Sequence, residues 1–197
     1  MSVAIALCSG LYEGTYKLIG GTPVLDFANL VSYRGTKRRH DWLEPDENVT
    51  RWAVAAGLPA PRAWEVAELR VFREVLADVF LSVADGLIPD RNGVAQIGAR
   101  AADAYSRREL RFPDQSGAAA WSRSPLLESL AIDAAELLTS AERLTRVAAC
   151  QECRWLFLDG SRNRSRRWCD PADCGNRARQ RRHYHRLQRI EPEGTAQ

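Results

Sequence analysis

Four cysteines near the C-terminus constrain this 197-residue chain more than any other feature. They form two close pairs, Cys150 with Cys153 and Cys169 with Cys174, and fifteen residues separate the pairs. A Cys-x2-Cys turn can place two sulfurs on one ion, and the intervening loop can bring the second pair round to complete a tetrahedron. Four cysteine ligands leave no open position for water, so the spacing predicts a structural Zn²⁺ site rather than a catalytic one.

Other uses of these cysteines are less well supported. Disulfides need an oxidising compartment, and nothing in the sequence argues for one. A redox Cys-x-x-Cys pair would leave Cys169 and Cys174 without a role, and no βαβ pattern surrounds it. His183 and His185 could replace one cysteine as ligand, but they lie nine and eleven residues beyond Cys174. We therefore expect zinc as the cofactor.

The C-terminal segment is also strongly basic. Residues 150–190 contain eleven arginines, no lysine and four acids, a formal charge of +7, whereas the rest of the chain carries −4. Zinc with four thiolates would lower this +7 to +5. A basic end on an acidic body is the electrostatic footprint of a nucleic-acid-binding segment. The alternative is a solvated basic surface, or one that pairs with the acidic body or with a partner.

The residues after Cys174 predict a helix from Gly175 to about Gln188. At 100° per residue, four of its arginines fall within an arc of about 80°. Such a stripe on a zinc-anchored helix suits phosphate contact or insertion into the major groove of DNA, and arginines between the cysteine pairs could widen it. Tyr184 and Leu187 fall roughly opposite, where they would pack on the body or on a second subunit. The predicted nucleic-acid-binding residues are Arg162, Arg164, Arg166, Arg167, Arg179, Arg182, Arg186 and Arg189.

Few residues are available to build a core inside so small a module. Trp155, Phe157 and Trp168 are expected to form it, with the metal replacing much of what is missing. Asp159 is typical of a turn or cap. Alternatively, Asp159 could hold Arg177 in a bidentate ion pair.

The first 148 residues carry helical periodicity. Thr22-Pro23 is typical of a helix start, Asp46 can cap a short helix, and apolar residues recur at helical spacing beyond Arg62. The predicted elements are helices beginning at Thr22-Pro23 and spanning about 46–56, 62–84, 93–106 and 124–148, with a β-hairpin of residues 108–112 and 118–123. Residues 1–16 carry little signal and are expected to be a poorly ordered start.

These elements predict a mainly α fold class. A multihelical N-terminal domain with a small β-hairpin would occupy residues 1–148, and a four-cysteine zinc module ending in a basic helix would occupy residues 149–190. Residues 191–197 would be a tail. The last helix of the N-terminal domain would lead directly into Cys150, which predicts a stiff junction.

Two polar residues in the first helix have a second interpretation. Asp26 and Asn29 are three residues apart and share a helical face. With Arg34 they could form the polar wall of a ligand pocket. The interpretation that we favour is a capping and loop-anchoring pair.

Short patterns around the cysteines match a known family. They are Cys150-x2-Cys153, Trp155-Leu-Phe-Leu-Asp159 with Ser161-Arg-Asn163, Arg167-Trp-Cys169, and Cys174-Gly-Asn-Arg177. These residues resemble the CGNR zinc finger. Upstream, residues 25–30, 41–43 and 52–58 are similar to the ABATE domain of stress-induced transcription regulators. The resemblance implies a bacterial regulator with a helical N-terminal domain and a zinc module at the C-terminus.

Composition and motifs narrow the function further. No apolar run reaches the ~18 residues of a membrane span, and no basic n-region marks a signal peptide. We expect a cytoplasmic protein, whose thiols stay reduced and can hold zinc. No nucleophile elbow, phosphate loop or metal-hydrolase motif is present, so we expect no enzyme. The sequence favours a DNA-binding transcription regulator, dimeric and responsive to a small-molecule effector; the alternative is a zinc-stabilised protein-interaction module that binds no nucleic acid.

Overall fold

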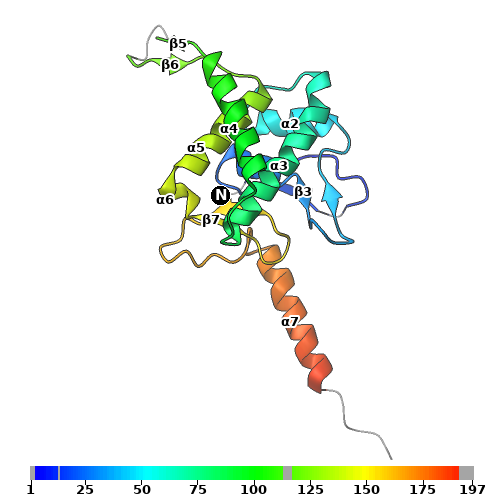
Figure 1. Cartoon of the computed structure of the whole chain (residues 1–197). Coiled ribbons are helices and arrows are strands. Elements are labelled where there is room, and N and C mark those ends of the chain that lie inside the picture. The colour runs from blue at the N-terminus through cyan, green and yellow to red at the C-terminus, as the bar shows by residue number, and fades with distance from the viewer. Residues whose placement is uncertain (1–2, 13, 113–116, 191–197) are drawn as a thin grey trace, which may run out of the picture.

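The computed structural model describes residues 3–12, 14–112 and 117–190, without the side chains of Val3, Arg189 and Ile190. It is mainly helical, as predicted (Figure 1). The helical elements are α1 (Pro23–Ala28), α2 (Glu47–Ala55), a 3-10 turn η1 (Ala63–Glu65), α3 (Val66–Ala84), α4 (Arg91–Ser106), α5 (Leu126–Thr139), α6 (Ala141–Leu144) and α7 (Cys174–Ile190).

The strands form short antiparallel pairs that lie between or beside the helices. The pairs are β1 (Val3–Ile5) with β2 (Tyr16–Leu18), β3 (Val31–Ser32) with β4 (His40–Asp41), β5 (Leu110–Arg111) with β6 (Ala120–Trp121), and β7 (Val147–Ala149) with β8 (Leu156–Leu158). The predicted hairpin corresponds to β5 and β6, and most of its turn lies outside the described residues.

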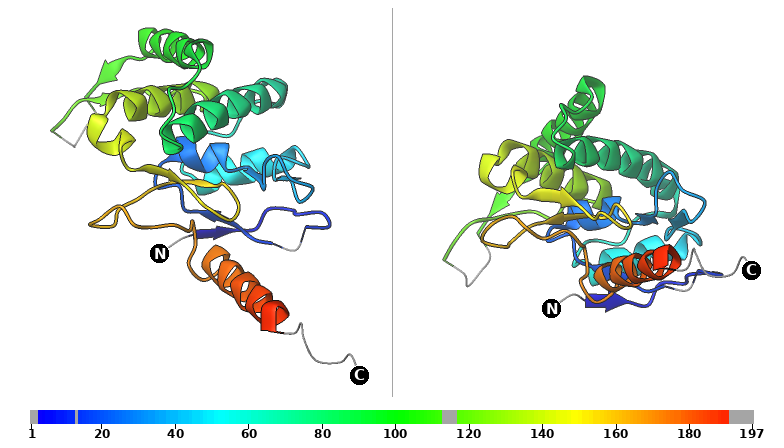
Figure 2. Two further views of the ribbon diagram at one scale, coloured as in Figure 1. Left: turned by 60° about the horizontal axis from the view of Figure 1, so that its bottom comes forward. Right: turned by 90° about the horizontal axis from the view of Figure 1, so that it is seen from below.

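Helix α3 is the centre of the body. Its apolar residues recur at helical spacing, and Leu69, Phe72, Leu76 and Phe80 are all buried. The helix packs on α1 and α4, and it also contacts β7 and β8 (Figure 2). The same central helix therefore supports both the N-terminal helices and the hairpin that carries the first cysteine pair.

The predicted helix over residues 124–148 was wrong at its C-terminal end. Helix α5 ends at Thr139, and the Ser140 side chain accepts a hydrogen bond from the Arg143 backbone N–H to start the short helix α6. The chain then becomes strand β7, in which Val147 pairs with Leu158 and is buried. A strand, not a helix, therefore leads into Cys150.

The described residues before Gly20 are more ordered than expected. Strands β1 and β2 pair, and Tyr16 is fully buried against the rings of Trp42 and Trp155. Residues of β2 thus reach both the helical body and the cysteine-bearing segment.

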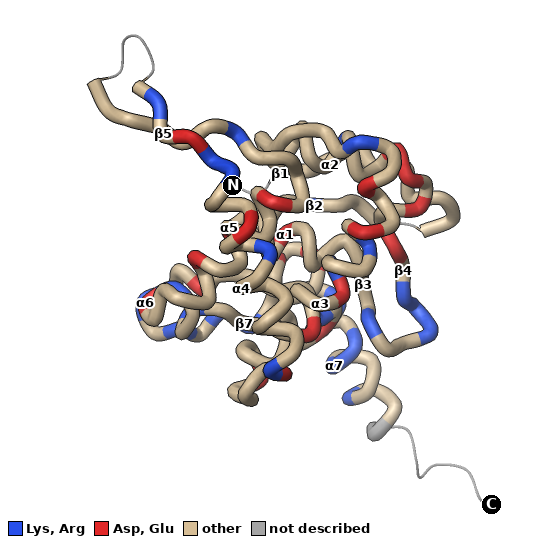
Figure 3. The backbone as a smooth tube through the Cα atoms, turned by 45° about the horizontal axis from the view of Figure 1, so that its top comes forward, with Lys and Arg blue, Asp and Glu red and all other residues tan. Residues whose placement is uncertain are grey.

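The C-terminal region divides into a packed part and a projecting part. The β7–β8 hairpin lies against the body, and Phe157 is fully buried within the same apolar core as α1 and α3. Helix α7 starts at this surface and extends away from it (Figures 1 and 2). Lys and Arg residues lie along α7 and also gather at the turn between β3 and β4 (Figure 3). No helix in the described part of the chain is long and apolar enough to cross a membrane.

Candidate metal centre and nucleic-acid interface

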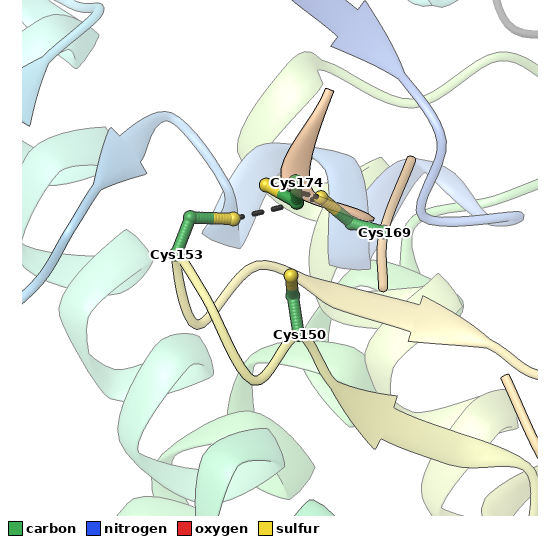
Figure 4. A group of neighbouring side chains, drawn as sticks. All are labelled: Cys150, Cys153, Cys169 and Cys174. Carbon is green, nitrogen blue, oxygen red and sulfur yellow. Dashed lines mark hydrogen bonds between the residues drawn. The ribbon is translucent and has the colours of Figure 1, made fainter. Parts of the chain in front are cut away.

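The four cysteines come together where the hairpin, the following loop and α7 meet. Cys150 and Cys153 lie in the β7–β8 turn, Cys169 in the loop, and Cys174 is the first residue of α7 (Figure 4). Their sulfur atoms all lie within 4.8 Å of one another, and all four residues are buried. Four converging thiols at this spacing are the donor set of a tetrahedral zinc site, so the residues fit the predicted metal.

The close approach of the thiols also calls for a cation. Contacts with the other three cysteines hold the pKa of Cys150 well below its usual range. The contact with Cys150 in turn raises the pKa of Cys153 and Cys169 well above theirs. Four thiolates within this distance would repel one another, so a cation is needed for all four to bind as thiolates. A bound Zn²⁺ would deprotonate the remaining thiols and hold the two cysteine pairs together.

Backbone hydrogen bonds preorganise the first cysteine pair. The Cys150 N–H donates to the Trp155 carbonyl at 2.8 Å, and the Arg154 N–H donates to the Cys150 carbonyl at 3.0 Å. Arg154 has φ 65°, which allows the chain to turn between the strands. From the body, the Tyr33 N–H donates to the Cys153 carbonyl at 3.3 Å.

Asn29 attaches this hairpin to α1. Its Nδ2 donates to the Leu156 carbonyl at 2.8 Å, and its Oδ1 accepts from the Leu156 N–H at 2.6 Å. Both residues are 2% exposed. The side-chain amide therefore pairs with the outer edge of β8 as another strand would, and it satisfies backbone groups that would otherwise be buried without partners.

Lys17 connects β2 to the second cysteine pair. Its ammonium lies 2.6 Å from the Asp170 carboxylate and 2.5 Å from the Asp173 carboxylate, and both acids lie between Cys169 and Cys174. These hydrogen bonds raise the pKa of Lys17 because they favour its charged form.

Two arginines in the first two turns of α7 have partners at the base of the helix. Arg177 donates to the Tyr33 hydroxyl, whose pKa is raised to about 12 by burial and by the neighbouring Tyr12. Arg181 pairs with Glu152, whose side chain is only 2% exposed. The alternative pairing of Asp159 with Arg177 is therefore not formed. Asp159 instead accepts from the Ser161 and Arg166 backbone N–H groups, the turn role favoured from the sequence.

The loop arginines predicted to contact nucleic acid differ in their freedom. Arg166 donates to the Trp168 and Cys169 carbonyls and lies 4.3 Å from the centre of the Phe157 ring, so it is part of the module's own structure. Arg167 donates twice to Gln151, at 2.9 and 2.7 Å. Arg162 and Arg164 are exposed on the loop surface.

The arginines further along α7 are more available. Arg179, Arg182 and Arg186 are exposed, and among the described residues neither Arg182 nor Arg186 has a carboxylate partner. Arg189 lies in the last turn of α7, and its side chain is outside the described part of the chain. Tyr184 and Leu187 do not pack on the body, because they are 59% and 49% exposed.

Comparison with known families agrees with both halves of this architecture. Residues 21–141 match the ABATE family, described as "putative stress-induced transcription regulator". Residues 146–187 match the CGNR zinc finger. The chain belongs to the ABATE family. A comparison with curated proteins finds no match.

The three residues of the predicted ligand pocket in the ABATE domain are hydrogen-bonded within the protein. Asp26 accepts from the Ile19 and Gly20 N–H groups, and burial raises its pKa to about 6. Asn29 is hydrogen-bonded to the backbone of Leu156, and Arg34 pairs with Glu74 and donates to the Ala28 carbonyl. All three side chains therefore have partners within the protein, and Asp26 and Asn29 have the anchoring role favoured from the sequence.

A hollow of about 230 Å³ lies instead between the ABATE domain and the CGNR zinc finger. Three of the zinc-site cysteines line it together with residues from β2, β3 and α7. The side chains that bear on its chemistry are Tyr12, Lys17, Tyr33, Trp42, Asp170 and Arg177.

Sequence reasoning missed the residues that join these two parts. Lys17, Tyr33 and Glu152 belong to no metal or nucleic-acid motif, and each acts through a partner far away in the chain. The only available signal was the paired acids Asp170 and Asp173, which stand out in an otherwise basic segment and imply a cationic partner.

Proposed function

We propose that this protein is a zinc-dependent, DNA-binding transcription regulator. The observation that carries the proposal is the state of α7, a zinc-anchored helix that projects from the body with Arg179, Arg182 and Arg186 exposed. Guanidinium groups without carboxylate partners are free to pair with phosphates or with guanine edges. Membership of a family described as a transcription regulator supports the same conclusion.

In this mechanism the protein's residues position the helix before DNA arrives. The zinc ion supplies only a structural cross-link between the cysteine pairs. Asn29 and Lys17 hold the two pairs against the ABATE domain, and Arg177 and Arg181 hold the base of α7. The helix thus loses little further freedom on binding, which reduces the entropic cost of association.

The proposal includes a sensing role for the ABATE domain and no catalytic one. An effector would act at the hollow between the domains, because residues of β2 and β3 there face the first turn of α7. A ligand that binds one arrangement of Arg177 and Tyr33 better than another would shift the orientation of the helix. Dimerisation belongs to the same proposal and would place two α7 helices on one DNA.

The second candidate is a protein-interaction module. The exposure of Tyr184 and Leu187 on α7 favours it, because large side chains on a projecting helix are typical contact points for a partner. This function requires no affinity for DNA, and the complex would break when Tyr184 or Leu187 is replaced.

Fluorescence anisotropy over a salt series separates the two functions. The zinc-loaded full chain is titrated into a labelled duplex of mixed sequence and compared with the Arg182→Gln/Arg186→Gln variant. The control variant, Arg51→Gln/Arg123→Gln, has the same charge change elsewhere. We expect the salt slope to fall by about 2 in the α7 variant only, because each lost phosphate contact removes about 0.9. Absence of binding by the zinc-loaded wild type at low salt would overturn the proposal in favour of the interaction module.

A further inference from the structure

The ABATE domain carries a basic cluster that the zinc module does not account for. Lys37, Arg38 and Arg39 occupy the turn between β3 and β4, and all three are exposed. Within the described residues Lys37 has no acidic partner, and Arg39 has only a 3.4 Å contact with Asp41. These residues, here called the β3–β4 tip, lie more than one hundred residues before α7 in the sequence.

A chain of contacts connects the β3–β4 tip to the base of α7. The Arg38 guanidinium lies 4.0 Å from the centre of the Tyr33 ring and 3.9 Å from the Glu152 carboxylate. Glu152 also pairs with Arg181, and Tyr33 accepts from Arg177. The tip is therefore a direct neighbour of the first two turns of α7, as the blue segments of β3–β4 and α7 in Figure 3 also indicate.

The β3–β4 tip is held rigidly from behind. Asp41 accepts two hydrogen bonds from the guanidinium of Arg73, at 2.5 and 2.7 Å, and Arg73 is 2% exposed. The Trp42 indole donates to the Ser32 hydroxyl at 2.9 Å across the base of the hairpin. Tyr33 has φ 52°, and the hydrogen bond from its N–H to Cys153 holds this uncommon backbone conformation. A cluster of like charges kept in a fixed position suggests a surface made for a polyanion.

The position of the tip relative to α7 indicates which polyanion. Helix α7 projects between two basic segments, the β3–β4 tip on one side of its base and the loop with Arg162 and Arg164 on the other (Figure 1). In duplex DNA a helix in the major groove has a phosphate strand on each side of it. Two basic segments beside one projecting helix fit this arrangement.

We propose that Lys37, Arg38 and Arg39 of the ABATE domain bind the phosphate strand on one side of a duplex whose major groove holds α7. This inference rests on the proposed DNA-binding function. The nucleic-acid interface would then contain residues of both the ABATE domain and the CGNR zinc finger. The orientation of the ABATE domain relative to the CGNR zinc finger then affects affinity for DNA directly, because the two segments must reach their phosphates together.

The test uses the full, zinc-loaded chain and the variant Lys37→Gln/Arg38→Gln/Arg39→Gln. The matched control is Arg51→Gln/Arg111→Gln/Arg123→Gln, which removes three exposed charges from α2, from β5 and from the residues just after β6, at the end of the body away from α7. Circular dichroism and zinc content establish that each variant is folded and loaded. Binding to a labelled duplex is then measured over a salt series.

We expect the tip variant to lower the salt slope by about 2 to 3, since each lost phosphate contact removes about 0.9, and the control variant to lower it by less than about 1. An unchanged slope in the tip variant, with a reduced slope in Arg182→Gln/Arg186→Gln, would overturn this inference and leave the DNA-binding function standing. Absence of wild-type binding would overturn both. Tighter binding to single-stranded RNA of equal length would overturn the duplex arrangement.

Discussion

The two cysteine pairs of the zinc finger differ in how they are attached to the rest of the molecule. The first pair lies in the β7–β8 hairpin, whose Phe157 is fully buried and whose Leu156 is bonded by Asn29. The second pair belongs to a loop and to α7, which reach the body through Lys17 and Arg177 and reach the turn of the first pair through Arg181. The first attachment is apolar and buried, and the second is polar and partly exposed.

The two halves of the zinc finger are therefore stabilised in different ways. The anchored half is part of the ABATE core, and burial of its apolar side chains stabilises it independently of the metal. The presenting half, from Cys169 to the end of α7, has little apolar contact of its own and relies on the zinc and a few ion pairs. The projecting turns of α7 carry mainly charged side chains, with Tyr184 and Leu187 exposed among them, so the stability of the helix depends on the contacts at its base.

Removal of zinc should affect the two halves most unequally. We expect a chelator, or Cys169→Ser, to abolish the protection of amides in the first two turns of α7, because structural zinc sites contribute about 10 kcal/mol or more. The β7–β8 amides should keep most of their protection. Hydrogen exchange followed by mass spectrometry measures both. Equal loss in both halves would show that the hairpin has no support without the metal.

Replacement of Phe157 by Ala should be the largest single-residue effect on the anchored half. The change removes a fully buried ring and should cost about 3 to 5 kcal/mol in the free energy of unfolding. Urea unfolding of the zinc-loaded protein measures this. Trp168→Ala, in the loop immediately before the presenting half, is the comparison, and it should cost less because that ring is only half-buried. Equal costs would remove the distinction.

Asn29→Ala tests the polar part of the anchor. The variant leaves the Leu156 N–H and carbonyl buried without partners, so we expect a loss of about 2 to 4 kcal/mol. Asn163→Ala provides the control, because Asn163 is exposed on the module surface. Thermal unfolding at fixed zinc concentration compares the two. A loss below that of the control would indicate that water replaces the amide.

Lys17→Gln should have the smallest effect. The pair with Asp173 is partly exposed and screened, so we expect about 0.5 to 1 kcal/mol, seen mainly as faster transfer of zinc to a chelator. Lys37→Gln is the matched control, since it removes the same charge from a position without an acidic partner among the described residues. Equal transfer rates in the two variants would show that Lys17 does not help to hold the second pair.

Much of this organisation could be predicted from local sequence. The cysteine spacing was sufficient for the metal site, and the apolar periodicity of residues 66–84 was sufficient for α3, because both signals lie within one short segment. The end of the helix predicted for residues 124–148 was missed, because Val147 and Ala148 fit a helical pattern as well as a strand. Only pairing with β8 selects the strand.

Long-range polar contacts could not be predicted in the same way. Asp26, Asn29 and Arg34 were grouped as a candidate pocket because they are close in sequence, but each is bonded to a different part of the chain. The arginines between the cysteine pairs form one basic segment in the sequence. Whether a given arginine is exposed, as Arg162 is, or bonded to carbonyls, as Arg166 is, depends on which side of the loop faces Phe157.

The bonding of Asn29 to Leu156 bears on how this zinc finger can be transplanted. A CGNR segment cut out at residue 146 and fused to a foreign protein would carry an uncovered apolar face and a strand edge ready to pair with other chains. Such a chimera is therefore expected to stay soluble only if the foreign protein supplies a helix with a side-chain amide at the position that Asn29 occupies here. In this respect the two family segments form a single structural unit, and exchange between relatives should succeed when both are exchanged together.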